Sequence, residues 1–197
     1  MNPMRFPFLA AAFLGLLPLP ALASTQDAEV FLKSAVNDVV AIASKSKNSA
    51  DLAERVRPVL IRTISFPDMT RLAIGPGWRQ FSLDERDKAT ALFTTLIIRT
   101  YSGKFTPGEV PEIAYKSATS TAPGKVEFST TTLYQGSRYE VVYRLTDLPD
   151  KGWRVTDVVI EGVSMVRNYR DQFDAQFKSG GAPAVLGSLA KTVESRK

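Results

Sequence analysis

Apolar residues recur at three- and four-residue spacing through the first half of the chain, which is the period of an amphipathic helix. A first helix is expected behind a cap at Ser24 or Thr25. Its apolar stripe consists of Phe31, Ala35, Val39 and Ile42. A second stripe follows a polar loop and consists of Leu52, Val56, Val59 and Leu60. Pro58 falls inside this second helix and should bend or divide it.

Two more helices are expected before residue 105. Pro67 suits the first turn of a short helix, which Gly75 to Gly77 should end. Ser82 and Glu85 have the spacing of a capping box, in which each side chain accepts a hydrogen bond from the other residue's backbone. The helix behind this box has the strongest apolar stripe of the chain: Ala89, Phe93, Leu96, Ile97 and Tyr101.

From about residue 109 the hydrophobic period changes to two, as in the run YEVVYRL from Tyr139 to Leu145. Glycine-containing turns separate four expected strands, near residues 110–118, 125–134, 137–147 and 152–162. Their short connections favour an antiparallel meander. A helix from Ser164 to Phe177, a break at SGGAP and a last short helix complete the chain. The prediction is one α+β domain, residues 24–197, with helices packed against a curved four-stranded antiparallel sheet.

The N-terminus has the three parts of a secretory signal: basic Arg5, an apolar run over residues 8–17, and small residues at Ala21 and Ala23. We expect residues 1–23 to be removed by cleavage after Ala23. A membrane anchor is the alternative, but a span needs about 20 uninterrupted apolar residues, and prolines interrupt this shorter run. A lipoprotein anchor is excluded because no cysteine follows the cleavage site.

The charge of the chain is modestly basic, with 25 Lys and Arg against 20 Asp and Glu and a formal net charge of +5. Removal of the signal takes away one basic residue, Arg5. The remaining surplus favours an anionic lipid or protein surface, or else only maintains solubility. Nucleic acid is a poor partner, because export separates the protein from it and the basic residues are scattered.

The chain contains no histidine and no cysteine. This excludes Ser-His-Asp and Cys-His catalysis as well as histidine and thiolate metal sites. We therefore expect no cofactor, no metal and no catalytic residue of these classes. An enzyme would have to use carboxylates, lysine, tyrosine or serine.

Three fragments imitate catalytic motifs. Residues 162–166 resemble the start of a nucleophile elbow, but its closing glycine is missing. Ser44 and Lys47 have Ser-x-x-Lys spacing within a solvated loop. Asp84, Glu85 and Asp87 could form a cation site, but acidic residues in the first turn of a helix are more simply explained by the helix dipole. We interpret all three as structural.

Asp157 and Glu161 are a possible acid/base pair, because residues four apart on a regular strand lie on one face. A pairing with Arg154 or with a neighbouring strand is the simpler interpretation.

Apolar side chains gather on three expected elements: the helix of Ala89 to Tyr101, the strand of Tyr139 to Leu145, and the strand-to-helix corner at Gly162. They form either a filled core or the wall of a cavity, and periodicity does not distinguish these. Four tyrosines favour the rim of a cavity, since a buried hydroxyl needs a partner: Tyr101, Tyr139, Tyr143 and Tyr169.

Two segments carry a resemblance to a known family. WRQFSLDERDKATALFTTLIIRTYSGKF and WRVTDVVIEGVSMVRNYRDQF are similar to the two hallmark segments of the MlaC, or toluene-tolerance, family, and FPDMTRLAIG resembles the short helix before the first. The second hallmark is a strand ending in Glu-Gly-Val-Ser that leads into a helix with Asn-Tyr-Arg. The resemblance extends from about Ala28 to Leu189.

This resemblance implies a periplasmic carrier that buries the acyl tails of a glycerophospholipid between sheet and helices. It implies shuttling between an outer-membrane lipoprotein complex and an inner-membrane ABC transporter with its substrate-binding ring, which maintains the lipid asymmetry of the outer membrane. The phospholipid is cargo, and no cofactor is implied. A related branch of the family is associated with hopanoids, while the Asn-Tyr-Arg form here is closer to the phospholipid branch.

The expected lipid-binding residues, as pocket wall or rim, come from the matching segments and from the strand that faces them. They are Trp78, Phe93, Ile97, Tyr101, Val141, Tyr143, Val159, Val163, Val166, Tyr169 and Phe173. Basic residues at matching positions could contact a head group or a partner: Arg79, Arg86 and Arg170.

Two other classes of function stay open. One is an exported cone-shaped α+β enzyme using Asp157, Glu161 or Tyr143, which would require an interior carboxylate with a raised pKa. The other is an interaction module with a filled core and no bound lipid.

Overall fold

The computed structural model describes residues 24–106 and 108–195, so the expected signal segment at 1–23 lies outside the described residues. Four helices come first in the chain: α1 Thr25–Ala43, α2 Ser49–Thr63, α3 Phe66–Ile74 and, after the 3-10 helix η1 Gly75–Gln80, α4 Leu83–Ser102. The expected capping box is present, because the Ser82 hydroxyl accepts from the Glu85 N–H and the Glu85 carboxylate accepts from the Ser82 N–H. Pro58 lies inside α2 without dividing it.

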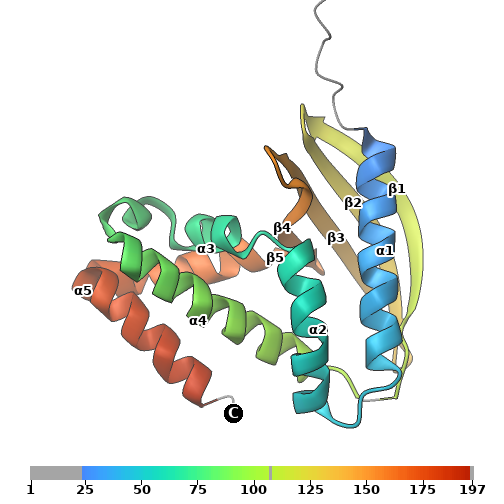
Figure 1. The fold of residues 1–197 in the computed structure, drawn as a ribbon, viewed down its shortest axis with the longest axis horizontal. Helices are drawn as coiled ribbons and strands as arrows, with labels where there is room; N and C mark the ends of the chain where they lie inside the picture. Colours follow the sequence, from blue (N-terminus) through green and yellow to red (C-terminus); the bar gives the residue numbers. More distant parts are fainter. Residues whose placement is uncertain (1–23, 107, 196–197) are drawn as a thin grey trace, which may run out of the picture.

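The sheet follows, with strands β1 Glu112–Ala122, β2 Lys125–Tyr134, β3 Ser137–Leu148, β4 Gly152–Ile160 and β5 Val163–Ser164. Over the described residues these strands form one antiparallel sheet in the order β1-β2-β3-β4-β5, which confirms the meander (Figure 1). The expected count of four strands is wrong. Glu161 and Gly162 have positive φ of 50° and 76°, so β4 ends at Ile160 and the short β5 returns beside it.

The C-terminal helix α5 spans Met165–Glu194 and contains the expected break. Gly180 and Gly181 have non-helical backbone angles, and the φ of 62° at Gly181 is one that side chains rarely adopt. The break divides α5 into a first arm before Gly180 and a second arm after Gly181. Both arms lie beside α4 in the helical half of the molecule (Figure 1).

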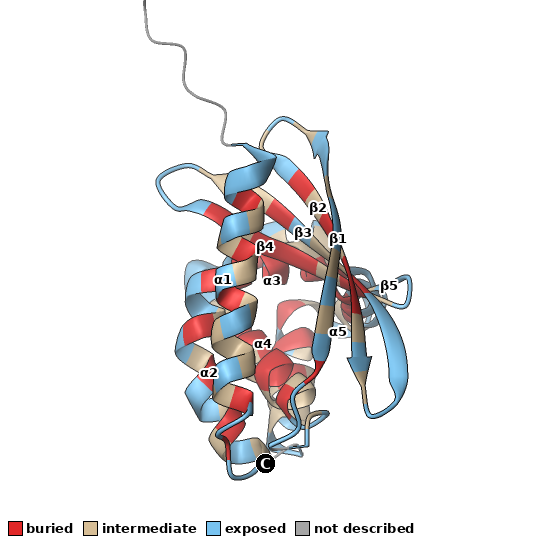
Figure 2. Cartoon of the chain, turned by 90° about the vertical axis from the view of Figure 1, so that its right-hand side faces the viewer, coloured by how far each residue is buried: buried red, intermediate tan, exposed pale blue. Residues whose placement is uncertain are grey.

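Buried apolar residues form two clusters, one in the helices and one against the sheet. The helix cluster draws on α2, α3, α4 and α5, while the sheet cluster joins Ala28 and Leu32 of α1 to the inner face of the sheet. Figure 2 shows buried residues on the sides of the helices and the sheet that face one another. Ile64 and Val158 are the partly buried residues that pack against both clusters. We call the zone between the clusters the seam.

No helix within residues 24–106 and 108–195 is long and apolar enough to cross a bilayer. The fold class is α+β, as expected, with an open antiparallel sheet and helices on its inner side.

Candidate functional site

The corner between β4 and α5 is fixed by one buried carboxylate. Asp157 is 6% exposed and accepts hydrogen bonds from the Ser164 hydroxyl at 2.6 Å and from the Val166 backbone N–H at 3.0 Å. Its third donor is the Arg144 guanidinium at 3.1 Å. Ser164 in turn caps α5 by accepting from the Arg167 N–H. Asp157 therefore ties two strands to the start of the helix.

The structure does not bring Asp157 and Glu161 together as an acid/base pair. Glu161 lies in the turn after β4, where its carboxylate accepts from the backbone N–H of Glu140. The cation that pairs with Asp157 is Arg144 of the neighbouring strand β3, which also pairs with Glu127. This confirms the simpler interpretation, in its form of a pairing with a neighbouring strand. Ser164 serves as a helix cap, so the elbow-like fragment there is structural.

A β-bulge in β4 changes which side chains face the helices. Arg144 lies opposite Asp157, but the next residue of β3 lies opposite Val155, so Thr156 is the extra residue. Strict alternation would place Val159 on the same face as Val155. With the bulge, Val158 takes that face and packs against both apolar clusters, while Val159 lies on the other face.

The inner face of the sheet carries an apolar ladder beside the seam. Tyr143 pairs with Val158, and Val141 pairs with Ile160, which pairs with Val163 of β5. Paired residues point to the same side of a sheet. Val163 is 59% exposed because β5 is the edge strand, so it lies at a rim rather than in a wall. Burial raises the pKa of Tyr143 to about 12, with a smaller contribution from Tyr115.

The expected lipid residues on α4 and α5 are densely packed against one another. Phe93 is fully buried, and its ring makes edge contacts with Tyr169 at 5.0 Å and with Phe173 at 5.7 Å between centroids. Ile97 and Val166 belong to the same helix cluster, and Tyr101 packs against it. In this structure Phe93 is a core residue.

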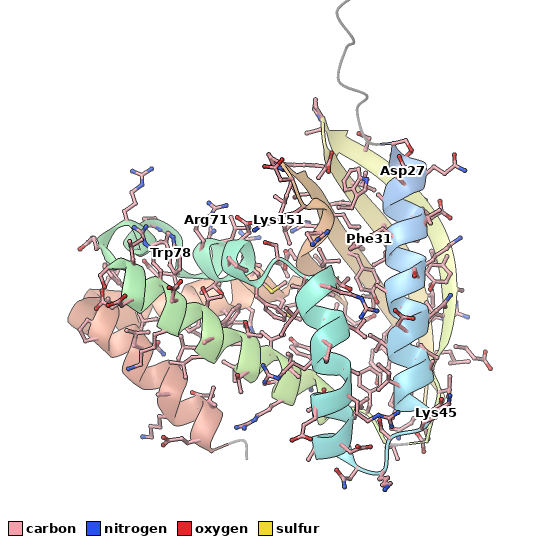
Figure 3. The ribbon with its side chains drawn as sticks, viewed as in Figure 1. Asp27, Phe31, Lys45, Arg71, Trp78 and Lys151 are labelled. Atoms are coloured by element: carbon pink, nitrogen blue, oxygen red, sulfur yellow. The ribbon has the colours of Figure 1, made fainter. Side chains whose placement is uncertain are left out.

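Trp78 and two of the expected arginines lie away from the sheet. Figure 3 shows Trp78 at the far end of the helical half, across the molecule from Phe31. The Trp78 ring stacks on Phe81 at 5.6 Å, and the Arg86 guanidinium lies 5.5 Å from the Trp78 centroid. Arg79 is exposed on η1. These residues form an aromatic and basic corner remote from the seam.

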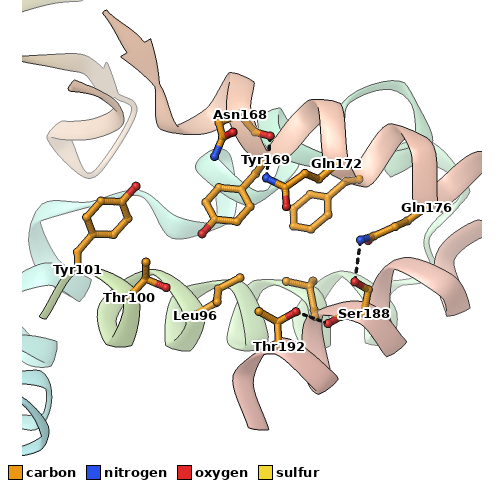
Figure 4. A pocket seen from close by; sticks show the side chains of 11 residues that line it. Leu96, Thr100, Tyr101, Asn168, Tyr169, Gln172, Gln176, Ser188 and Thr192 are labelled. Atoms are coloured by element: carbon orange, nitrogen blue, oxygen red, sulfur yellow. Dashed lines mark hydrogen bonds between the residues drawn. The ribbon is translucent and has the colours of Figure 1, made fainter. Parts of the chain in front are cut away.

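A pocket of about 240 Å³ lies between α4 and the two arms of α5 (Figure 4). We call it the α4–α5 pocket. Its apolar and aromatic lining consists of Leu96, Tyr101, Tyr169, Phe173 and Leu189. Its polar lining consists of Thr100, Asn168, Gln172, Gln176, Ser188 and Thr192. Three of the expected lipid residues thus meet at this pocket, and no residue of the sheet lines it.

A second concavity is an open, charged groove of about 910 Å³ between α3, the start of α5 and the outer face of the sheet. Arg71, Lys125, Arg144, Arg167 and Arg170 line it together with four carboxylates. Two of the acids bind Arg144, and Asp68 pairs with Arg71 at 3.1 Å. The Arg170 guanidinium donates to the Leu72 carbonyl. This groove is too polar to hold acyl tails.

The part of the chain that the structure describes contains no group of acidic side chains placed to hold a metal ion. The Ser44 hydroxyl donates to the Ala41 carbonyl, so the Ser-x-x-Lys fragment is a helix end. Glu85 belongs to the capping box of α4.

Sequence reasoning missed Ile64 and Val158, the residues at the seam. Ile64 follows the last residue of α2 and forms an isolated bridge with Val155, which no local pattern predicts. Val158 was hidden by the bulge, which reverses the alternation of β4.

Comparisons with known proteins agree with this architecture. The family model described as MlaC protein matches residues 33–191. Among solved structures, a phospholipid-binding protein from Ralstonia solanacearum, determined in complex with a phospholipid, is 25% identical with a TM-score of 0.79. The match covers 86% of this chain and 98% of that one. A search of curated proteins finds no significant match. Because the family model spans most of the chain, this protein belongs to the MlaC family.

Proposed function

We propose that this protein binds a glycerophospholipid with its acyl tails in the seam between the helix cluster and the sheet cluster, and carries it across the periplasm. The single observation that carries the proposal is the division of the apolar core into two clusters in a chain of the MlaC family. The similar protein from Ralstonia solanacearum binds a phospholipid on the same fold.

The seam suits acyl tails because both of its sides are apolar. Val141, Tyr143, Val158 and Ile160 share the inner face of the sheet, opposite the helices. Each buried methylene contributes about 0.8 kcal/mol, so two long tails gain enough to replace the contacts that Ile64 and Val158 make between the clusters. Val163, exposed at the end of the ladder, would form the rim where tails enter.

Neither pocket offers an alternative place for both tails. The α4–α5 pocket, at about 240 Å³, is smaller than the roughly 300–1,000 Å³ typical of ligand pockets. The groove beside Arg144 is large but lined by charged groups. We therefore infer that tail entry widens the seam, with the helical and sheet halves moving apart.

The proposed route runs between an outer-membrane lipoprotein complex and an inner-membrane ABC transporter with its substrate-binding ring, in support of outer-membrane lipid asymmetry. The family membership and the signal-like N-terminus support this route. Arg170 of α5 is placed for a head group or partner, since it lines the charged groove. Arg79 and Arg86, remote from the seam, suit a partner contact.

The test is native mass spectrometry of the mature protein purified without detergent, followed by extraction and identification of bound lipid. We expect one two-tailed phospholipid per bound complex. Val158→Trp, which fills the seam, should abolish the lipid-bound mass while the protein remains folded. Val30→Trp is the matched control, because Val30 is 64% exposed on α1 and should retain lipid. Undiminished lipid in folded Val158→Trp would refute the seam as the site.

An enzyme using Asp157, Glu161 or Tyr143 is the competing function. Asp157 is committed to three structural hydrogen bonds, and the Glu161 carboxylate accepts from a backbone N–H in the turn after β4, so the two do not form an acid/base pair. The raised pKa of Tyr143 makes it a poor proton acceptor near neutral pH. A clean lipid-free mass that persists after incubation with phospholipid vesicles would instead favour the enzyme or filled-core alternatives.

A further inference from the structure

We propose that the α4–α5 pocket is a second binding site, which takes an uncharged, single-chain amphiphile bearing hydroxyl groups, such as a monoacylglycerol. This ligand class goes beyond the two-tailed cargo of the seam. The proposal rests on the lining of the pocket, its volume and one buried hydrogen-bond acceptor without a partner.

The α4–α5 pocket has an apolar side and a polar side, and no charged residue lines it. Leu96, Phe173 and Leu189 provide the apolar side. The polar side is made of amides and hydroxyls, among them Gln172 and Gln176. A phosphate head group would find no cation there, and a bare hydrocarbon would leave the amides without partners. The lining therefore favours a neutral ligand that has both an alkyl part and hydroxyl groups.

One polar atom in this lining is buried and unpaired. The Gln176 amide nitrogen donates to the Ser188 hydroxyl at 2.7 Å, but Gln176 Oε1 is buried without a hydrogen-bond partner. If the amide were turned around, the nitrogen would be left unpaired instead. A buried carbonyl oxygen without a donor is costly, and a ligand hydroxyl can supply that donor.

The volume of the pocket sets the size of the ligand. At about 240 Å³ the pocket is smaller than the roughly 300–1,000 Å³ of typical ligand pockets. That space excludes two long tails and fits one short acyl chain with its glycerol group.

The two arms of α5 build the pocket together. The break at Gly180 and Gly181 turns the second arm back, so that Ser188 meets Gln176 of the first arm (Figure 4). Because every lining residue belongs to α4 or α5, this site is separate from the ladder on the inner face of the sheet.

The test compares monooctanoylglycerol with methyl octanoate, which has the same acyl chain but no hydroxyl, by isothermal titration calorimetry. Wild type should bind monooctanoylglycerol about tenfold more tightly, the difference expected when a buried polar group gains a partner. Gln176→Leu should remove this preference, and Ser188→Ala, which keeps Oε1, should retain it. Gln80→Leu is the control, since Gln80 is exposed on η1 and should behave as wild type. Equal binding of both ligands to wild type, or no binding of either, would overturn the proposal.

Two variants distinguish ligand binding in the α4–α5 pocket from phospholipid binding in the seam. Val158→Trp should lose phospholipid and keep the tenfold preference for monooctanoylglycerol, while Gln176→Leu should keep phospholipid and lose that preference. If Val158→Trp also loses monooctanoylglycerol while remaining folded, the two sites are one and the separate pocket is refuted.

Discussion

Asp157 joins the sheet to α5, and its replacement by asparagine tests whether this corner is structural. The carboxylate is 6% exposed and accepts from Ser164, Val166 and Arg144. Oδ2 receives the Ser164 hydroxyl and the Arg144 guanidinium, and Oδ1 receives the Val166 N–H. Asparagine has one carbonyl oxygen, so its NH₂ group must face one of these sets of donors.

The expected cost follows from which hydrogen bond is lost. An NH₂ group facing the Val166 N–H leaves that buried donor unpaired and removes a hydrogen bond to a charged acceptor, which costs about 1.5–3 kcal/mol. The weakened contact to Arg144 adds less than about 1 kcal/mol, because Arg144 is 47% exposed and keeps Glu127 as a partner. Asp157→Asn should therefore lower the free energy of unfolding by about 2–4 kcal/mol.

Urea unfolding followed by circular dichroism measures this loss. With a slope of about 2 kcal/mol per molar, the midpoint should fall by about 1–2 M without a change in slope. Asp171→Asn is the matched control: the same substitution at an exposed position in the same groove should change stability by less than about 0.5 kcal/mol. A midpoint for Asp157→Asn equal to that of the control would refute the structural role of the carboxylate.

Two further predictions concern Tyr143 and Phe93. Burial raises the pKa of Tyr143 from an ordinary 10.0 to about 12 in the folded protein. The contribution of this neutral phenol to the free energy of unfolding is therefore fully present below pH 10 and is lost as pH rises through 12. Between pH 10 and 12 wild type should lose up to about 2.7 kcal/mol more than Tyr143→Phe in denaturant titrations, and parallel losses would contradict the buried phenol. Phe93→Ala should cost about 3–5 kcal/mol in thermal unfolding because it removes both edge contacts, whereas Leu83→Ala, at a 75% exposed position, should cost under about 0.5 kcal/mol. A small loss at Phe93 would mean that its ring lines a cavity.

Local signals were sufficient to predict most helices and turns of this fold. The capping box of Ser82 and Glu85 begins α4, and Gly180 and Gly181 break α5 where expected. These features depend on interactions between residues a few positions apart, so they can be predicted from the local sequence. The antiparallel meander follows in the same way from short turns between strands.

The placement of side chains around the candidate site is harder to predict from sequence, because it depends on distant pairings. The bulge at Thr156 forms against β3 and reverses the alternation, so regular alternation predicts that Val159 faces the helices, whereas Val158 does. Trp78 stays a predicted pocket residue on the basis of the first hallmark, and packing with Phe81 places it at the far end of the helical half. The pairing of Gln176 with Ser188 requires the two arms of α5 to meet, which no local pattern shows.

The bulge at Thr156 gives β4 two roles in one strand. By adding a residue, it directs Asp157 to the outer face, where the carboxylate holds the start of α5, and Val158 to the inner face, where the side chain contacts both clusters. Without the bulge, the side chains of β4 would alternate regularly from Val155, which faces inward. Asp157 would then face inward and Val158 outward. The apolar seam would then contain a carboxylate, which would disfavour the acyl tails that we propose bind there. The extra residue therefore keeps the seam apolar while anchoring the helix that forms its other side.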